Sequence, residues 1–114
     1  YRNTPTTRVT PSGAVLRFDS QKEARRYDFL IERERRGEIR DLRVQVDFTL
    51  QEAYTDTEGR RVRAIRYRAD FTYHEGAQGV QVVEDVKSRA TRTREYAMKK
   101  KLLKDRFGID ITEV

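Results

Sequence analysis

The clearest pattern in the chain is a strict alternation of apolar and polar residues between positions 41 and 50. Because successive side chains of a β-strand point to opposite faces, this alternation predicts a half-buried strand. A turn at residues 56–59 leads into a second predicted strand over 62–73, and a turn at 74–79 leads into a third over 80–87. The pattern therefore predicts three consecutive antiparallel strands.

The same period of two predicts which side chains share a face within each strand. In the first strand the apolar face holds Leu42, Val44, Val46, Phe48 and Leu50. In the second strand we expect Asp70 on the face opposite to Ile65, Tyr67, Ala69, Phe71 and Tyr73.

Two segments have the three-to-four residue spacing of amphipathic helices, and a glycine follows each of them. They span residues 21–36 and 93–107, and residues 109–114 predict a last short strand parallel to a neighbour. The expected fold is α/β with the order α-β-β-β-α-β, a mixed sheet flanked by helices in a single domain over residues 14–114. Residues 1–13 have little to bury, so we expect a flexible N-terminal arm.

Composition narrows the range of functions. The 114 residues include 25 Lys and Arg against 19 Asp and Glu, and residues 87–106 hold nine of the basic residues but only two acidic ones. Such a local positive charge suits a polyanionic partner such as nucleic acid. The chain has no cysteine, which excludes disulfides and thiolate metal sites, and a single histidine makes zinc a poor fit. No run of about 18 apolar residues predicts a membrane span, and we expect a cytoplasmic location.

Two carboxylates and an ammonium group are the candidate chemistry. Asp85 and Lys87 share one face of the third predicted strand, and Asp70 lies on the second. The simplest interpretation is an ion pair on the solvent face, which would contribute about 0–1 kcal/mol. The alternative is a site for a divalent cation, because Mg²⁺ prefers oxygen ligands.

The element order, with an acid on the second strand and Asp-x-Lys on the third, resembles the PD-(D/E)XK nuclease superfamily. Local segments are most similar to an uncharacterised group of small phage and prophage endonuclease-like proteins within it. These segments are Phe18-Asp19-Ser20-x-x-Glu23-Ala24-Arg25, Gly37-Glu38-Ile39, Arg68-Ala69-Asp70-Phe71, Val83-Glu84-Asp85-Val86-Lys87 and Phe107-Gly108-Ile109. The proline that often precedes the first acid in the superfamily is Ala69 here.

The resemblance implies that Asp70, Asp85 and the Val86 backbone carbonyl bind Mg²⁺, for which Mn²⁺ could substitute. It also implies that Lys87 orients the attacking water. Many members of the superfamily carry a metal-facing glutamate on the first helix, which would be Glu23. The alternative for Glu23 is purely structural, because Ser20-x-x-Glu23 matches a helix capping box.

Other charged residues have different predicted roles. Glu84 alternates away from Lys87, so we expect it to have a partner on the opposite face. His74 is expected to be a solvated turn residue. A loop and helix after the third strand carry the candidate DNA-backbone contacts Arg89, Arg92, Arg94, Lys99 and Lys100.

The resulting hypothesis is a metal-dependent endodeoxyribonuclease, encoded by a phage and active in the bacterial host. A domain this small leaves little room for sequence reading, so we expect selectivity for branched DNA, as in a Holliday-junction resolvase acting in recombination or replication. Symmetric cleavage of a junction needs two active sites, which predicts a homodimer. The alternatives are a sequence-specific, nicking or flap endonuclease, and a non-catalytic DNA-binding module. RNA also stays open as a substrate.

Overall fold

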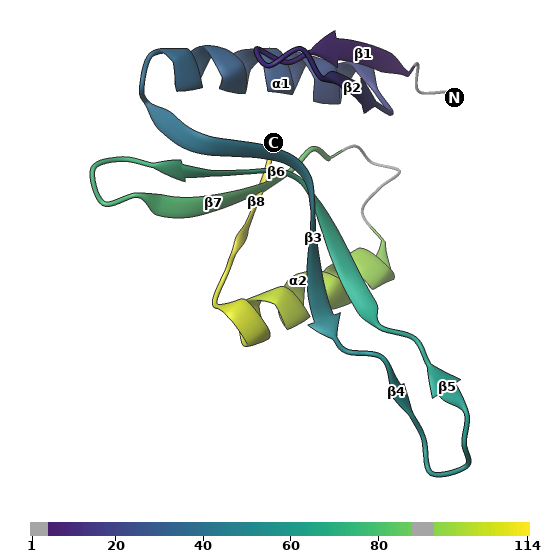
Figure 1. Cartoon of the computed structure of the whole chain (residues 1–114). Helices are drawn as coiled ribbons and strands as arrows, with labels where there is room; N and C mark the ends of the chain where they lie inside the picture. Colours follow the sequence, from purple (N-terminus) through teal and green to yellow (C-terminus); the bar gives the residue numbers. More distant parts are fainter. Residues whose placement is uncertain (1–4, 88–92) are drawn as a thin grey trace.

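The computed structural model describes residues 5–87 and 93–114. Its main sheet has four strands in the order β3-β6-β7-β8, where β3 spans Ile39–Gln51, β6 Ile65–Glu75, β7 Val80–Asp85 and β8 Ile111–Glu113. The first three strands are antiparallel, and β8 is parallel to β7. Helices α1 (Gln21–Arg35) and α2 (Arg94–Phe107) lie on opposite sides of this sheet (Figure 1). The predicted α/β order, α-β-β-β-α-β, is therefore confirmed.

Both helices begin and end within one residue of their predicted bounds. The Ser20 side chain accepts a hydrogen bond from the Glu23 backbone N–H, and the Thr93 side chain accepts one from the Tyr96 N–H. Each bond satisfies a backbone donor that has no partner within the helix. Gly108 ends α2 with a positive φ of 70°, a left-handed conformation that glycine adopts without steric cost.

The apolar residues form two clusters, one beneath each helix. The first cluster joins the β6 residues Phe71 and Tyr73 to α1, and its buried members are Phe18, Ala24, Tyr27, Leu30, Ile39, Phe71 and Tyr73. The second cluster joins Tyr67 and Ala69 to α2, and its buried members are Leu50, Tyr67, Ala69, Val83, Leu103 and Ile111. Each helix thus covers a core of its own.

This division corrects the prediction that five apolar residues of β6 share one face. Tyr67 and Ala69 pack toward α2, whereas Phe71 and Tyr73 pack toward α1. The change of side falls at Asp70. Strand β3 changes sides at the same level, because Leu42 and Val44 pack with the α1 cluster and Phe48 and Leu50 with the α2 cluster.

The backbone of β3 is irregular at this point. Val44 pairs with Phe71 and Val46 with Ala69, so Gln45 lies between these pairs, opposite Asp70. Gln45 has a φ of 53°, which non-glycine residues rarely adopt. This unusual backbone conformation in β3 lies at the same level of the sheet as the change of side at Asp70 in β6.

The N-terminal segment differs from the predicted flexible arm over residues 1–13. Strand β1 (Thr6–Val9) pairs with β2 (Val15–Phe18) in an antiparallel hairpin beside α1 (Figure 1). The Arg8 guanidinium donates two hydrogen bonds to the Asp28 carboxylate, at 2.9 and 3.1 Å. The segment has few apolar residues of its own to bury. Its backbone pairing with β2 and the bonds from Arg8 to Asp28 on α1 hold it in place instead. The part of the arm over residues 1–4 lies outside the described residues.

A second hairpin extends from the far end of β3 and β6. Strands β4 (Tyr54–Thr55) and β5 (Arg61–Val62) pair with each other and form a ribbon that projects from the body (Figure 1). The ribbon lengthens the molecule, whose radius of gyration is 16.2 Å, against about 13 Å for a compact domain of this length.

Candidate active site

Asp85 and Lys87 form a buried ion pair at the end of β7. The Lys87 Nζ lies 2.9 Å from Asp85 Oδ1, and both residues are 7 % exposed. The pair is therefore not the solvent-exposed ion pair that was the simplest interpretation of the sequence. Removing two charges from water is costly, so a buried pair contributes little net stability compared with apolar residues of the same shape.

A tyrosine contacts each member of this pair. The Tyr67 hydroxyl donates to Asp85 Oδ2 at 2.6 Å, and burial together with the neighbouring carboxylate raises the pKa of Tyr67. The Lys87 ammonium lies 3.4 Å from the centre of the Tyr96 ring. Burial and these contacts leave both charged groups few alternative positions.

Asp70 approaches the pair from β6. Its Oδ2 accepts the backbone N–H of Val86 at 2.7 Å. Burial, followed by the nearby charges of Glu23 and Asp85, raises the pKa of Asp70 to about 7, although the bond from Val86 opposes this rise. The neighbouring Asp85 carboxylate is a like charge that disfavours the ionised form of Asp70.

Glu23 completes the group of acids from the first turn of α1. Burial raises its pKa, and the charges of Asp19 and Asp85 raise it further. Its backbone N–H is at the same time capped by Ser20. The cap and the location beside Asp85 therefore occur together, and the two interpretations of Glu23 are compatible.

The acids are close enough to influence one another, yet they are not arranged as ligands. Within residues 5–87 and 93–114, no group of three acidic or histidine side chains has the spacing to hold a metal ion. Asp85 is occupied by Tyr67 and Lys87, and Asp70 by the Val86 N–H. The donor set nevertheless fits Mg²⁺ or Mn²⁺ in its chemistry, because it consists of carboxylate oxygens. The predicted role of the Val86 carbonyl stays a prediction.

Glu84 faces the other side of β7, as the alternation predicts. Its fully buried carboxylate accepts two hydrogen bonds from the Arg26 guanidinium, at 2.8 and 2.7 Å, and a third from the Tyr73 hydroxyl. This bidentate contact balances its charge. His74 differs from its prediction, because it lies within β6 and its Nδ1 is 3.1 Å from Asp41 Oδ2.

The predicted DNA contacts are only partly described. Arg94 is the first residue of α2 and is exposed, Lys99 pairs with Glu95 at 3.2 Å, and Lys100 lies 3.4 Å from Glu113. Arg89 and Arg92 lie outside the described residues. Lys100 contacts Glu113, which also accepts the Tyr96 hydroxyl, and Tyr96 contacts Lys87. Lys100 therefore lies on the side of α2 that carries Tyr96.

Sequence reasoning missed several residues that the fold brings to the site. The Lys22 ammonium on α1 donates to the Lys87 carbonyl at 2.5 Å. Glu113 on β8 pairs in register with Asp85 and accepts the Tyr96 hydroxyl at 2.7 Å. The hydroxyl of Tyr67, at an apolar position of a predicted strand, could have pointed to a polar contact in the interior. Lys22 and Glu113 lie in no sequence pattern that would indicate their contacts.

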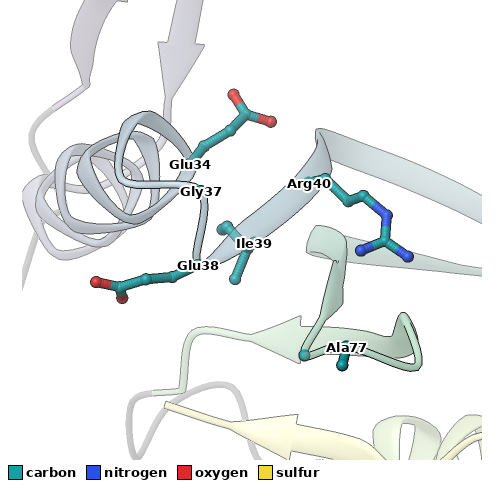
Figure 2. A pocket seen from close by; sticks show the side chains of 7 residues that line it. Glu34, Gly37, Glu38, Ile39, Arg40 and Ala77 are labelled. Carbon is teal, nitrogen blue, oxygen red and sulfur yellow. The ribbon is translucent and has the colours of Figure 1, made fainter.

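A separate hollow of about 640 Å³ lies between the end of α1, the start of β3 and the turn between β6 and β7 (Figure 2). None of the acids around Asp85 lines it. Its lining residues are Glu34, Gly37, Glu38, Ile39, Arg40, Gly76 and Ala77.

One family model, described as "Protein of unknown function (DUF1064)", matches residues 7–112 and so covers nearly all of the chain. The chain belongs to the DUF1064 family. No curated protein and no solved structure matches this DUF1064 chain significantly. The match begins within β1, so the N-terminal hairpin is part of the DUF1064 region. No helix among the described residues is long and apolar enough to cross a membrane.

Proposed function

We propose that this chain is a metal-dependent endonuclease that hydrolyses phosphodiester bonds of DNA. The observation that carries the proposal is the buried Asp85–Lys87 pair beside Asp70, an acid whose pKa is raised to about 7. Strongly perturbed acids next to a buried lysine are typical of catalytic sites. The resemblance of the Asp70 and Asp85-Val86-Lys87 segments to the PD-(D/E)XK superfamily supports the same reaction.

In this proposal the acids hold the metal and Lys87 acts on the substrate. Asp70 and Asp85 would bind Mg²⁺ or Mn²⁺, with the Val86 carbonyl and Glu23 as further ligands. When bound, the ion would polarise the phosphoryl oxygen and lower the pKa of a bound water. Lys87 would orient the attacking water and offset the negative charge that develops on the phosphate.

Basic residues on both helices support DNA as the substrate. Lys22 on α1 and Lys100 on α2 each contact a residue of the site or its immediate neighbour. Together with Arg94 and Lys99, and with Arg89 and Arg92, they would bind the phosphates on either side of the cleaved bond. Contacts of this kind position the backbone and read no bases.

The preferred DNA is proposed to be branched, with the chain acting as a homodimer in the cytoplasm of a phage-infected host. The argument is that the contacts proposed above bind the DNA backbone and read no bases, so selectivity would come from the shape of the DNA. Nicking or flap cleavage is the alternative within enzymes.

The test is cleavage of matched four-way, flapped, single-stranded and linear duplex DNAs in Mg²⁺ and in Mn²⁺. We expect the wild type to cut branched DNA, and Asp85→Asn and Lys87→Ala to bind the same DNA without cutting it. Lys101→Ala is a matched control, because this residue lies one position beyond Lys100 and is exposed. A wild type that binds DNA but cuts none of the four substrates would instead identify a DNA-binding module.

A further inference from the structure

Lys87 can act on a substrate only if its ammonium group is held in one place. A lysine side chain carries a compact charge on a flexible four-carbon stem, so its ammonium group samples many positions unless neighbours restrict it. Among the described residues, the carboxylate of Asp85 and the ring of Tyr96 contact this group.

The Tyr96 contact has the geometry of a cation–π interaction. The ammonium nitrogen is 3.4 Å from the ring centre, well inside the range of about 6 Å over which the ring attracts a cation. Lys87 is 7 % exposed, so little water competes for its charge.

The ring is in turn held from two directions. The backbone N–H of Tyr96 donates a hydrogen bond to the Thr93 side chain, which fixes the first turn of α2. Its hydroxyl donates to Glu113 Oε2 at 2.7 Å, and Glu113 pairs in register with Asp85 on the neighbouring strand. The position of the ring therefore depends on the docking of α2 against β8.

The two contacts of Lys87 would respond differently to a metal. A cation bound to Asp85 competes with Lys87 for the same carboxylate charge, whereas the Tyr96 ring carries no formal charge and keeps its attraction for the ammonium. The ring is thus the contact that could hold Lys87 when the carboxylates are engaged.

We propose that Tyr96 is a positioning residue that holds the Lys87 ammonium in place for the reaction, and that Glu113 fixes the Tyr96 ring. This inference rests on the proposed nuclease function, because it assigns Tyr96 a role at that same site. It links the C-terminal strand to a reaction whose other residues lie on α1, β6 and β7.

The experiment compares Y96L, which removes the ring, with Y96F, which keeps it. We expect Y96L to lower kcat about 10- to 100-fold, since small misplacements of catalytic groups have effects of this size. Its affinity for DNA should be unchanged, and Y96F should lose only a few-fold. Tyr54→Leu serves as the matched control, because Tyr54 is an exposed tyrosine on the β4–β5 ribbon. A Y96L protein with wild-type kcat would overturn the proposal.

A second readout separates this proposal from the nuclease function itself. Protons on the Lys87 Cε, next to a ring face, shift upfield in ¹H–¹³C spectra, and they can be observed without any substrate. We expect this shift in the wild type, in Y96F and in Y54L, and its loss in Y96L. If the wild type cuts no DNA but the shift follows this order, the nuclease proposal fails and the contact between ring and lysine stands. A Lys87 signal at its ordinary position in the wild type would overturn the placement.

Discussion

Replacing Asp70 by asparagine should change how the stability of the protein depends on pH. Burial and the charges of Glu23 and Asp85 raise the pKa of Asp70 from 3.8 to about 7 in the folded protein. The folded state therefore keeps a proton, between about pH 4 and pH 7, that the unfolded chain has already released. Stability falls with rising pH wherever the folded state binds more protons, so this group costs increasing stability up to about pH 7.

The size of the effect follows from the shift. A change of one pKa unit corresponds to 1.36 kcal/mol, so a rise of about three units costs on the order of 4 kcal/mol above pH 7. This value is an upper bound, because the surrounding structure and water can relax when Asp70 becomes charged. Asparagine keeps an oxygen that can accept the Val86 N–H, and it has no charge at any of these pH values.

Urea unfolding at intervals between pH 4 and pH 8, with EDTA present, measures the difference. We expect Asp70→Asn to gain stability over the wild type as the pH rises, by up to about 4 kcal/mol in all. Asp47→Asn is the control, because the hydrogen bond from Arg68 lowers the pKa of Asp47, so its contribution changes only below about pH 4. Parallel curves for Asp70→Asn and the wild type would refute the assignment of the shift to Asp70.

Three further outcomes can be measured on the same protein. Adding Mg²⁺ or Mn²⁺ at pH 8 should raise the melting temperature of the wild type but not of Asp70→Asn, because an ion that binds only the folded state stabilises it. Arg26→Ala should lower the free energy of unfolding by about 3 kcal/mol in urea, since it leaves the buried Glu84 carboxylate without its cation; Arg35→Ala, an exposed position on the same helix, is the control. Replacing residues 53–63 by a short turn should change stability by less than about 1 kcal/mol, because β4 and β5 pair with each other and not with the main sheet; a larger loss would mean that the ribbon supports the core.

The sequence predicts those parts of the fold that depend on local periodicity. The order of elements, the ends of both helices and the separation of Glu84 from Asp85 and Lys87 all follow from spacing and capping residues. The change of side at Asp70 could not be predicted in this way, because the residues before and after it both alternate with a period of two. The residues before Asp70 differ from those after it only in the helix against which they pack, α2 or α1.

The candidate site shows the same division. Asp85 and Lys87 can be selected from the sequence because charges are unusual in so apolar a strand, whereas Asp70 and Glu23 are assigned to the site by the resemblance to the PD-(D/E)XK superfamily. Tyr96 and Glu113 look like ordinary helix and strand residues, and only the fold brings the Tyr96 ring to Lys87 and the Glu113 carboxylate to the Tyr96 hydroxyl. Residues whose role comes from contacts distant in the sequence carry no local pattern that would reveal them.

Adjacent residues of β7 give the strongest physical reason to assign a function to one side of the sheet. The carboxylate of Glu84 is fully buried, and it is balanced by a bidentate arginine and a tyrosine. On the opposite side Asp85 has a lysine, but of the residues that the structure describes none forms an ion pair with Asp70 or Glu23, and the pKa values of both are raised. Glu84 shows that this fold can place a cationic side chain against a buried carboxylate. The negative charge of Asp70 and Glu23 is not balanced in this way, which costs stability. A bound divalent cation would recover that cost.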